Sequence, residues 1–136
     1  CQGYFTEERG DCYGGNFNIV KVIIESPIAP TSCEGLFQGL TACKVIEGIE
    51  KLDTSRATSM EDMFASCFKL YNPDVSGFDT SNVTDMSGMF TSCHAITKLD
   101  LSNFDTSKVT DMSKMFVACH GLATELNLSS FIFCYF

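Results

Sequence analysis

The side chains with the most reactive chemistry are the eight cysteines of this 136-residue chain. Cys67, Cys93 and Cys119 follow one another at intervals of 26 residues, and no pair of cysteines shows the C-x-x-C spacing of a zinc ribbon or a thioredoxin-type site. On neighbouring packed helices, which lie about 8–10 Å apart, these residues would be too distant for a disulfide, which needs Cα atoms within roughly 7 Å. We therefore expect three free, buried thiols, and Cys33 and Cys43 could face inward as well.

Cys1, Cys12 and Cys134 lie outside this spacing. A disulfide between Cys1 and Cys12 would hold the irregular start of the chain together, and Cys12 with Cys33 is the rival pairing. Cys134 is the candidate for a bond between molecules, because an odd cysteine in a secreted protein can pair with a second chain.

The two histidines, His94 and His120, are also 26 residues apart, and each follows one of the regularly spaced cysteines. Cysteine and histidine together could bind zinc. However, adjacent residues on a helix point about 100° apart, so a cysteine and the histidine after it cannot easily bind the same ion. We expect two stacked imidazoles on the surface and no metal site.

The aspartates of three D-T-S triplets could form a carboxylate ladder that binds Ca²⁺ or supplies an acid and a base. These residues are Asp53, Asp79 and Asp105. The triplet equally suits a turn, because Asp, Thr and Ser side chains bond to nearby backbone amides, and we favour the turn. The sequence contains no G-x-S-x-G motif, no Gly-rich phosphate loop and no nucleophile–base signature. We therefore expect no catalytic residue, no metal and no cofactor, and we do not expect an enzyme.

The regular spacing of these side chains comes from an internal repeat. The stretch FDTSNVTDMSGMF, residues 78–90, returns as FDTSKVTDMSKMF at residues 104–116. Corresponding aspartates mark three full copies, and a fainter earlier copy starts at Thr31. A period of 20 to 50 residues is typical of a solenoid.

Within one copy, apolar residues at positions i, i+3, i+4 and i+7 predict a short helix, with Thr84 as its N-cap. These apolar residues are Met86, Met89, Phe90 and Cys93. The stretch that follows, residues 96–104, has the L-x-x-L-x-L spacing of a leucine-rich repeat, and its Leu99 and Leu101 predict a strand.

These elements predict an α/β fold, a short right-handed leucine-rich-repeat solenoid with a parallel sheet on one side and short helices on the other. Residues 16–25 are rich in β-branched side chains and predict an N-terminal capping strand. We expect residues 1–30 to form an N-terminal cap with a disulfide-prone segment and this strand. Residues 31–130 would form about four coils, and residues 131–136 an apolar C-terminal tail or capping strand.

The unit FDTSxVTDMSxMFxxC, followed by LxxLDLSNFDTS, resembles the BspA-type leucine-rich repeats of bacterial surface proteins and lipoproteins. The resemblance covers roughly residues 31–131. It implies a secreted or cell-surface protein that takes part in adhesion or binds a host or matrix protein. Because the family contains lipoproteins, whose mature chains begin with a lipid-bearing cysteine, Cys1 would be the candidate site of a lipid anchor at the N-terminus.

The composition narrows the functional classes further. The net charge is −8, from nine Lys and Arg against seventeen Asp and Glu. A nucleic-acid-binding protein should carry a basic patch, so we expect no nucleic-acid partner. No run of eighteen apolar residues occurs, so we expect no membrane span.

Two functional hypotheses follow. The first is a non-enzymatic module for adhesion or protein binding, with the partner bound by residues that vary between copies. They form two rows, Arg56, Asn82 and Lys108 in one, and Asp62, Gly88 and Lys114 in the other. The alternative is a subunit that assembles with copies of itself into an extracellular filament through its apolar ends, because an open strand edge invites pairing with another chain. The candidate assembly end is Phe131, Ile132, Phe133, Cys134, Tyr135 and Phe136.

Overall fold

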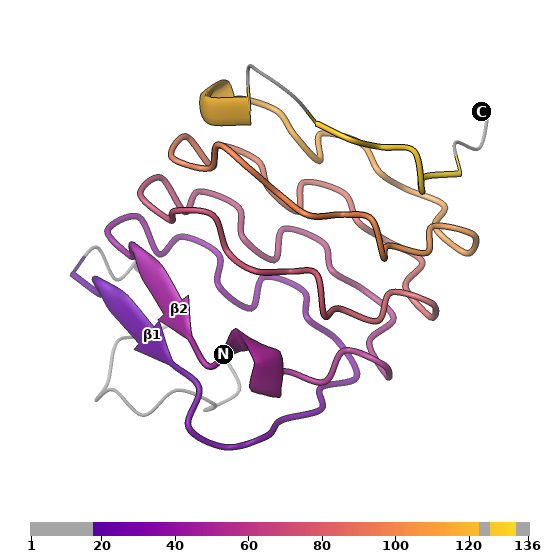
Figure 1. The fold of residues 1–136 in the computed structure, drawn as a ribbon, viewed down its shortest axis with the longest axis horizontal. Helices are drawn as coiled ribbons and strands as arrows, with labels where there is room; N and C mark the ends of the chain where they lie inside the picture. Colours follow the sequence, from indigo (N-terminus) through magenta and orange to yellow (C-terminus); the bar gives the residue numbers. More distant parts are fainter. Residues whose placement is uncertain (1–17, 123–125, 133–136) are drawn as a thin grey trace.

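The computed structural model describes residues 18–122 and 126–132 (Figure 1). Two short strands, β1 (Lys21–Ile23) and β2 (Val45–Glu47), pair in parallel. Two 3₁₀ turns, η1 (Ile49–Lys51) and η2 (His120–Leu122), are the only helical elements of the described residues. The predicted α/β leucine-rich-repeat solenoid is therefore wrong: the sheet has two strands, and within the described residues no α-helix covers it.

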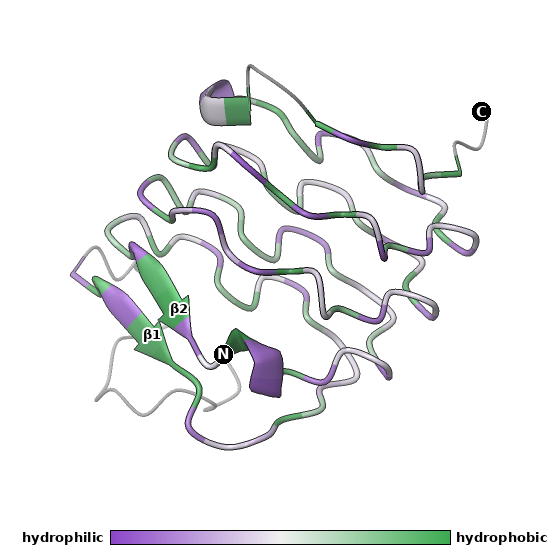
Figure 2. Ribbon diagram, viewed as in Figure 1, coloured by the Kyte–Doolittle hydropathy of each residue, from purple (hydrophilic) through white to green (hydrophobic). Residues whose placement is uncertain are grey.

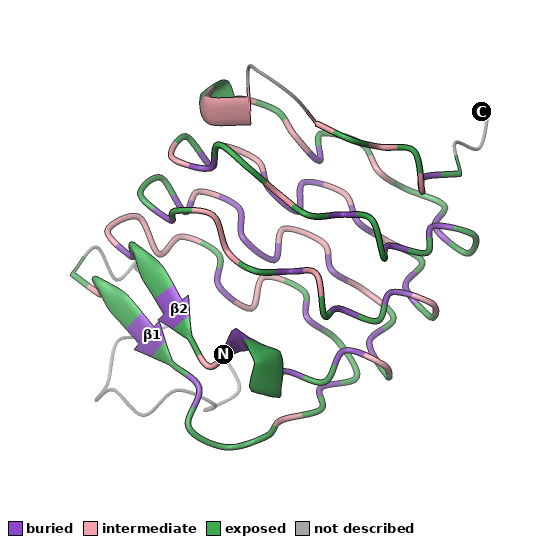
Figure 3. Ribbon diagram, viewed as in Figure 1, coloured by how far each residue is buried: buried purple, intermediate pink, exposed green. Residues whose placement is uncertain are grey.

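The copies of the repeat nevertheless lie side by side (Figure 1). We call residues 31–52, 53–78, 79–104 and 105–130 the first to fourth copies. Isolated parallel bridges join Ser59 to Asp85 and Asp85 to Asp111, at equivalent positions of successive copies. Hydrophilic and hydrophobic residues alternate along each copy, and the buried ones run through the inner copies (Figures 2 and 3).

The predicted helix fails because alternate backbone amides donate to the next copy. Met86 N–H donates to the Asp111 carbonyl at 2.9 Å, and Phe90 N–H to the Met115 carbonyl at 3.0 Å. An α-helix capped at Thr84 would need the Phe90 amide for the Met86 carbonyl, four residues earlier in the same copy. Gly88 also has a φ of 63°, outside the helical region. The i, i+3, i+4, i+7 spacing therefore identified the buried side chains of the copy correctly, but it misassigned their backbone.

Thr84, predicted as a helix cap, and its equivalents in the neighbouring copies serve a different purpose. The Thr58 hydroxyl donates to the Thr31 carbonyl, the Thr84 hydroxyl to Thr58, and the Thr110 hydroxyl to Thr84. Each of these bonds joins one copy to the preceding copy.

The strand predictions were only partly right. The capping strand was predicted over residues 16–25, but the strand in the structure, β1, has only three residues. Residues 16 and 17 lie outside the described part. Leu99 and Leu101 form no strand, although Leu101 is buried and Leu99 half-buried. The stretch therefore contributes to the core without adding to the sheet.

Aromatic rings stack along the axis of the molecule. The Phe37, Phe64, Phe90 and Phe116 rings follow one another with centroids 5.4, 5.3 and 5.9 Å apart. The first three rings are almost fully buried, whereas that of Phe116, in the fourth copy, is only half-buried. Each ring is thus covered by the ring of the next copy, which is the physical reason why one copy cannot bury its own apolar face.

The regularly spaced cysteines form a second column, and the prediction that they are free is confirmed. The Cys67, Cys93 and Cys119 thiols donate to the carbonyls of Phe37, Phe64 and Phe90 at 3.0, 3.1 and 2.9 Å. Cys119 is half-buried, so the prediction of three buried thiols is wrong for this one. Burial raises the pKa of the Cys67 thiol to about 12, mainly because a thiolate there would be desolvated.

Three buried threonines, Thr54, Thr80 and Thr106, connect the copies from within the structure. The Thr80 hydroxyl donates to the Asp105 carbonyl at 3.1 Å and accepts the Asp105 amide at 2.8 Å. One hydroxyl thus satisfies both backbone polar groups of a residue in the next copy.

Replacing Thr80 by Val should therefore lower the free energy of unfolding by about 1–3 kcal/mol, because both backbone groups of Asp105 would lose their partner. Urea denaturation monitored by circular dichroism would measure this change. Thr84→Val is the matched control: this threonine is exposed, so its loss should cost less than about 0.5 kcal/mol. Equal losses for the two variants would contradict the role assigned to the buried hydroxyl.

Candidate functional site

The fourth copy ends the stack with a row of backbone amides that have no partner among the described residues. In the second copy, the equivalent amides donate to the third copy at 2.8–2.9 Å; they belong to Met60, Asp62, Phe64 and Ser66. In the third copy, they donate to the fourth at 2.8–3.0 Å; they belong to Met86, Gly88, Phe90 and Ser92. The unpartnered amides, which we call the donor row, belong to Met112, Lys114, Phe116 and Ala118.

The donor row is open because the described chain adds only part of another copy. The Thr106 hydroxyl bonds the amide and the carbonyl of Ile132 at 2.7 and 3.3 Å, just as Thr80 bonds Asp105. Residues 131–132, which follow the fourth copy, therefore continue the stack on one side. On the other side, no described segment covers residues 112–118.

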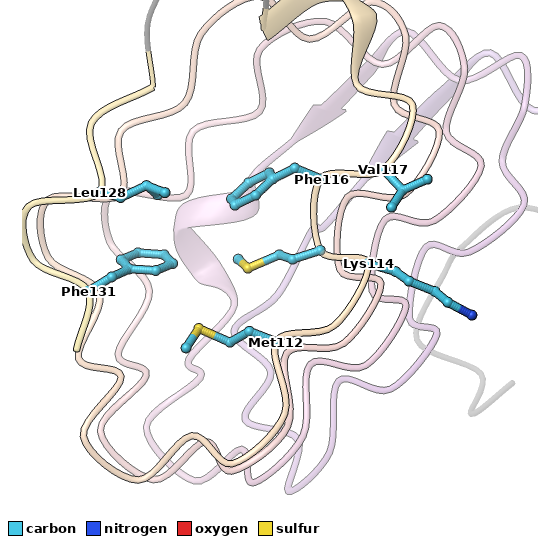
Figure 4. A pocket seen from close by; sticks show the side chains of 7 residues that line it. Met112, Lys114, Phe116, Val117, Leu128 and Phe131 are labelled. Atoms are coloured by element: carbon cyan, nitrogen blue, oxygen red, sulfur yellow. The ribbon is translucent and has the colours of Figure 1, made fainter. Parts of the chain in front are cut away.

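A cavity of about 360 Å³ lies between these two sides. It is lined by Met112, Lys114, Met115, Phe116, Val117, Leu128 and Phe131. Figure 4 shows Phe131 and Leu128 facing Phe116 across it, while the Lys114 side chain extends away toward the surface. The other six lining residues are apolar, so the cavity suits the burial of apolar side chains.

Apolar residues at this edge are more exposed to solvent than their equivalents in the third copy. Met86 and Phe90 are fully buried, whereas Met112 and Phe116 are half-buried. Val117 is 52% exposed. The fourth copy therefore offers both unpaired amides and uncovered apolar surface, which together mark a template for another segment.

The first predicted binding row holds copies together. The Asn82 side-chain amide donates to the Ser55 carbonyl at 2.9 Å, and the Lys108 ammonium donates to the Asn82 side-chain oxygen at 3.0 Å. Arg56 is exposed in the same row. Two of the three residues of this row thus form hydrogen bonds between copies. None of the three lines the cavity.

The residues of the second predicted row share an unusual backbone conformation. Asp62, Gly88 and Lys114 have φ values of 52°, 63° and 58°, in the left-handed region. A Cβ at Gly88 would collide with the Asp62 carboxylate, which shows how closely successive residues of this row approach one another. Only Lys114, at the end of the row, borders the cavity.

Two residues of the predicted assembly end, Phe131 and Ile132, lie in the described part of the chain. Phe131 is 8% exposed and stacks on Phe104 with ring centroids 6.1 Å apart, so it belongs to the core rather than to an exposed tail. Ile132 is 54% exposed. The remaining residues of that end, and the predicted Cys1–Cys12 disulfide and lipid attachment at Cys1, lie outside the described residues. Sequence reasoning missed the donor row, because residue types and spacing do not show which backbone amides lack a partner.

The aspartates of the D-T-S triplets form turns, as predicted. One carboxylate oxygen of Asp79 accepts the Ser81 amide at 3.0 Å and the Ser81 hydroxyl at 2.6 Å. These bonds hold the pKa of the Asp79 carboxyl below its ordinary value. Within residues 18–122 and 126–132, no cluster of three or more potential ligands could hold a metal ion.

The histidines also lie as predicted. The His94 and His120 rings stack with centroids 5.2 Å apart, and Phe68 continues the column at 5.1 Å from His94. Both histidines are exposed. The lining of the cavity contains no member of this column.

The exposure of the edge predicts different reactivities for equivalent thiols. In folded protein, iodoacetamide should alkylate Cys119 well before Cys67 and Cys93, because the thiolate is the nucleophile and the two inner thiols are buried. The raised pKa of Cys67, about 12, lowers its thiolate fraction about a thousandfold relative to an ordinary thiol. Peptide mapping by mass spectrometry would give the rate for each cysteine, and guanidinium-unfolded protein would serve as the control. If Cys93 reacted as fast as Cys119, the fourth copy would not be the exposed edge.

A family model described as "Mycoplasma protein of unknown function, DUF285" matches residues 31–131. This match overturns the resemblance to BspA-type leucine-rich repeats. Searches among curated proteins and among solved structures find no match. None of the described residues forms a helix long and apolar enough to cross a membrane. The matched residues span all four copies and most of the chain, and the protein thus belongs to the DUF285 family.

Proposed function

We propose that this protein is a non-enzymatic protein-binding module and that its open edge, the donor row with the apolar cavity beside it, is the binding surface. The observation that carries this proposal is the row of four amides without partners in the described part of the chain. Another polypeptide segment can add to such an edge because its backbone carbonyls accept from the exposed amides, while its side chains fill neighbouring pockets.

The chemistry of the edge favours a polypeptide over other ligands. The donors recur at every second residue, and so do the carbonyls of residues 111, 113, 115 and 117 that cover the third copy, so a polypeptide backbone can match them. Apolar side chains beside them, among them Met112 and Val117, would lose contact with water on binding. The net charge of −8 disfavours a nucleic acid. Lys114 is the one ionisable residue lining the cavity, which supports binding rather than acid–base catalysis.

Secretion, surface attachment and adhesion to host or matrix proteins stay predictions. They came from the resemblance to bacterial surface proteins rather than from a property of the edge. The proposed binding surface does not depend on them, because it is defined by backbone groups and apolar contacts.

Selection of a random twelve-residue peptide display library against the immobilised protein would test this function. Val117→Asp should weaken the selected peptides about tenfold or more, because it places a charge where apolar surface must be buried. Val20→Asp is the matched control, since Val20 is similarly exposed, at 59% against 52% for Val117, but lies in the N-terminal part of the chain.

Bound peptide should also slow hydrogen exchange at the amides of the donor row. Peptides that bind both variants equally, or that protect amides elsewhere, would place the binding surface away from this edge. Failure to select any binder would contradict the proposed function as a whole.

A further inference from the structure

We infer that the segment bound at the open edge carries the sequence pattern of the repeat itself, D-x-S-x-M-F, and lies over residues 112–118 as residues 111–117 lie over residues 86–92. This inference rests on the proposed function and adds to it the chemistry of the partner. The partner is thus a segment of a repeat-bearing chain that adopts the same series of tight turns as residues 111–117.

The structure already contains two examples of an occupied edge. In the third copy, Met86, Gly88, Phe90 and Ser92 are covered by the carbonyls of residues 111, 113, 115 and 117 at 2.8–3.0 Å. In the second copy, the covering carbonyls belong to residues 85, 87, 89 and 91 at 2.8–2.9 Å. Since the donor row of the fourth copy repeats the same alternation, it should accept a segment of the same kind in the same register.

The side chains impose an aromatic requirement. Phe64 and Phe90 stack at 5.3 Å with their ring planes 3° apart, and Phe90 and Phe116 stack at 5.9 Å, also 3° apart. The outer face of the Phe116 ring is the next position of this column, beside the cavity. A phenylalanine directly after the partner's methionine would fill it, and offset stacking of this kind contributes beyond the buried area.

Lys114 adds a preference in charge. Successive residues of its row approach one another so closely that a Cβ at Gly88 would collide with the Asp62 carboxylate. The partner residue in this register would therefore lie beside Lys114. An aspartate there would pair with the ammonium group, whereas a lysine would face a like charge. The repeat itself offers both choices, as Asp62 in the second copy and Lys114 in the fourth.

A labelled synthetic peptide, DTSKVTDMSKMFVA, which repeats residues 105–118, would test this inference by fluorescence anisotropy. It should bind the full chain and protect the donor-row amides from hydrogen exchange, whereas a scrambled peptide of the same composition should not. Replacing its phenylalanine after the second methionine by alanine should weaken binding about three- to tenfold, through the lost stacking and buried area.

A charge exchange would test the register. A peptide with aspartate in place of the lysine that corresponds to Lys114 should bind about two- to fivefold more tightly, as expected for an exposed ion pair. The variant Lys114→Asp should invert this preference. The variant is expected to fold, because Asp62 already adopts the same left-handed φ at the equivalent position. A preference that did not invert would overturn the proposed register.

The two proposals can fail separately. Library peptides that bind the edge without the repeat pattern, together with an inactive repeat peptide, would refute this inference and leave the proposed function standing. Absence of any binding at the edge would refute both. If the repeat peptide binds, sedimentation of the intact protein identifies the source of the segment. Self-association that the peptide blocks indicates a second copy of this chain, and a monomer indicates another repeat-bearing protein; either result supports the inferred chemistry.

Discussion

The structure depends on one constraint, the direction of alternate backbone amides. In the segment from Met86 to Ser92, every second N–H leaves its own copy and donates to the next. The amides between them stay within the copy: Ser87 N–H donates to the Asp85 carboxylate, and the next two close turns three residues back. A backbone arranged in this way cannot continue as a helix, and it cannot satisfy its hydrogen bonds within one copy. Each segment therefore needs the neighbouring copy to complete its backbone hydrogen bonds. In the fourth copy, the four amides of the donor row lack this partner among the described residues.

Side chains reinforce this constraint from both sides. Stacked phenylalanines and thiols fill the interior, and the buried hydroxyl of Thr80 bonds both polar groups of Asp105. At the surface, Asn82 and Lys108 continue the pattern as side-chain bonds from copy to copy. Many residues that differ between copies are thus engaged in stacking, which leaves the end of the stack, rather than its flank, as the surface with unused binding capacity.

The sequence predicted what is buried better than it predicted the backbone. The period of 26 residues, the buried methionines, phenylalanines and cysteines, and the turns at the aspartates could all be inferred from residue type and spacing. The helix could not be excluded in this way, because apolar residues at i, i+3, i+4 and i+7 face one side both in a helix and in a chain of tight turns. The distinction lies in where the N–H of Met86 or Phe90 points, and the side-chain pattern does not encode that direction. The donor row escaped sequence reasoning for the same reason.

The donor row also restricts the symmetry of any complex formed through it. Between residues 112 and 118 the uncovered amides all donate, and the carbonyls of residues 111, 113, 115 and 117 are already bonded to the third copy. If two molecules met there around a two-fold axis, donors would face donors, and neither row would be satisfied. A complex through this edge must therefore be asymmetric, with one chain giving hydrogen bonds and the other receiving them.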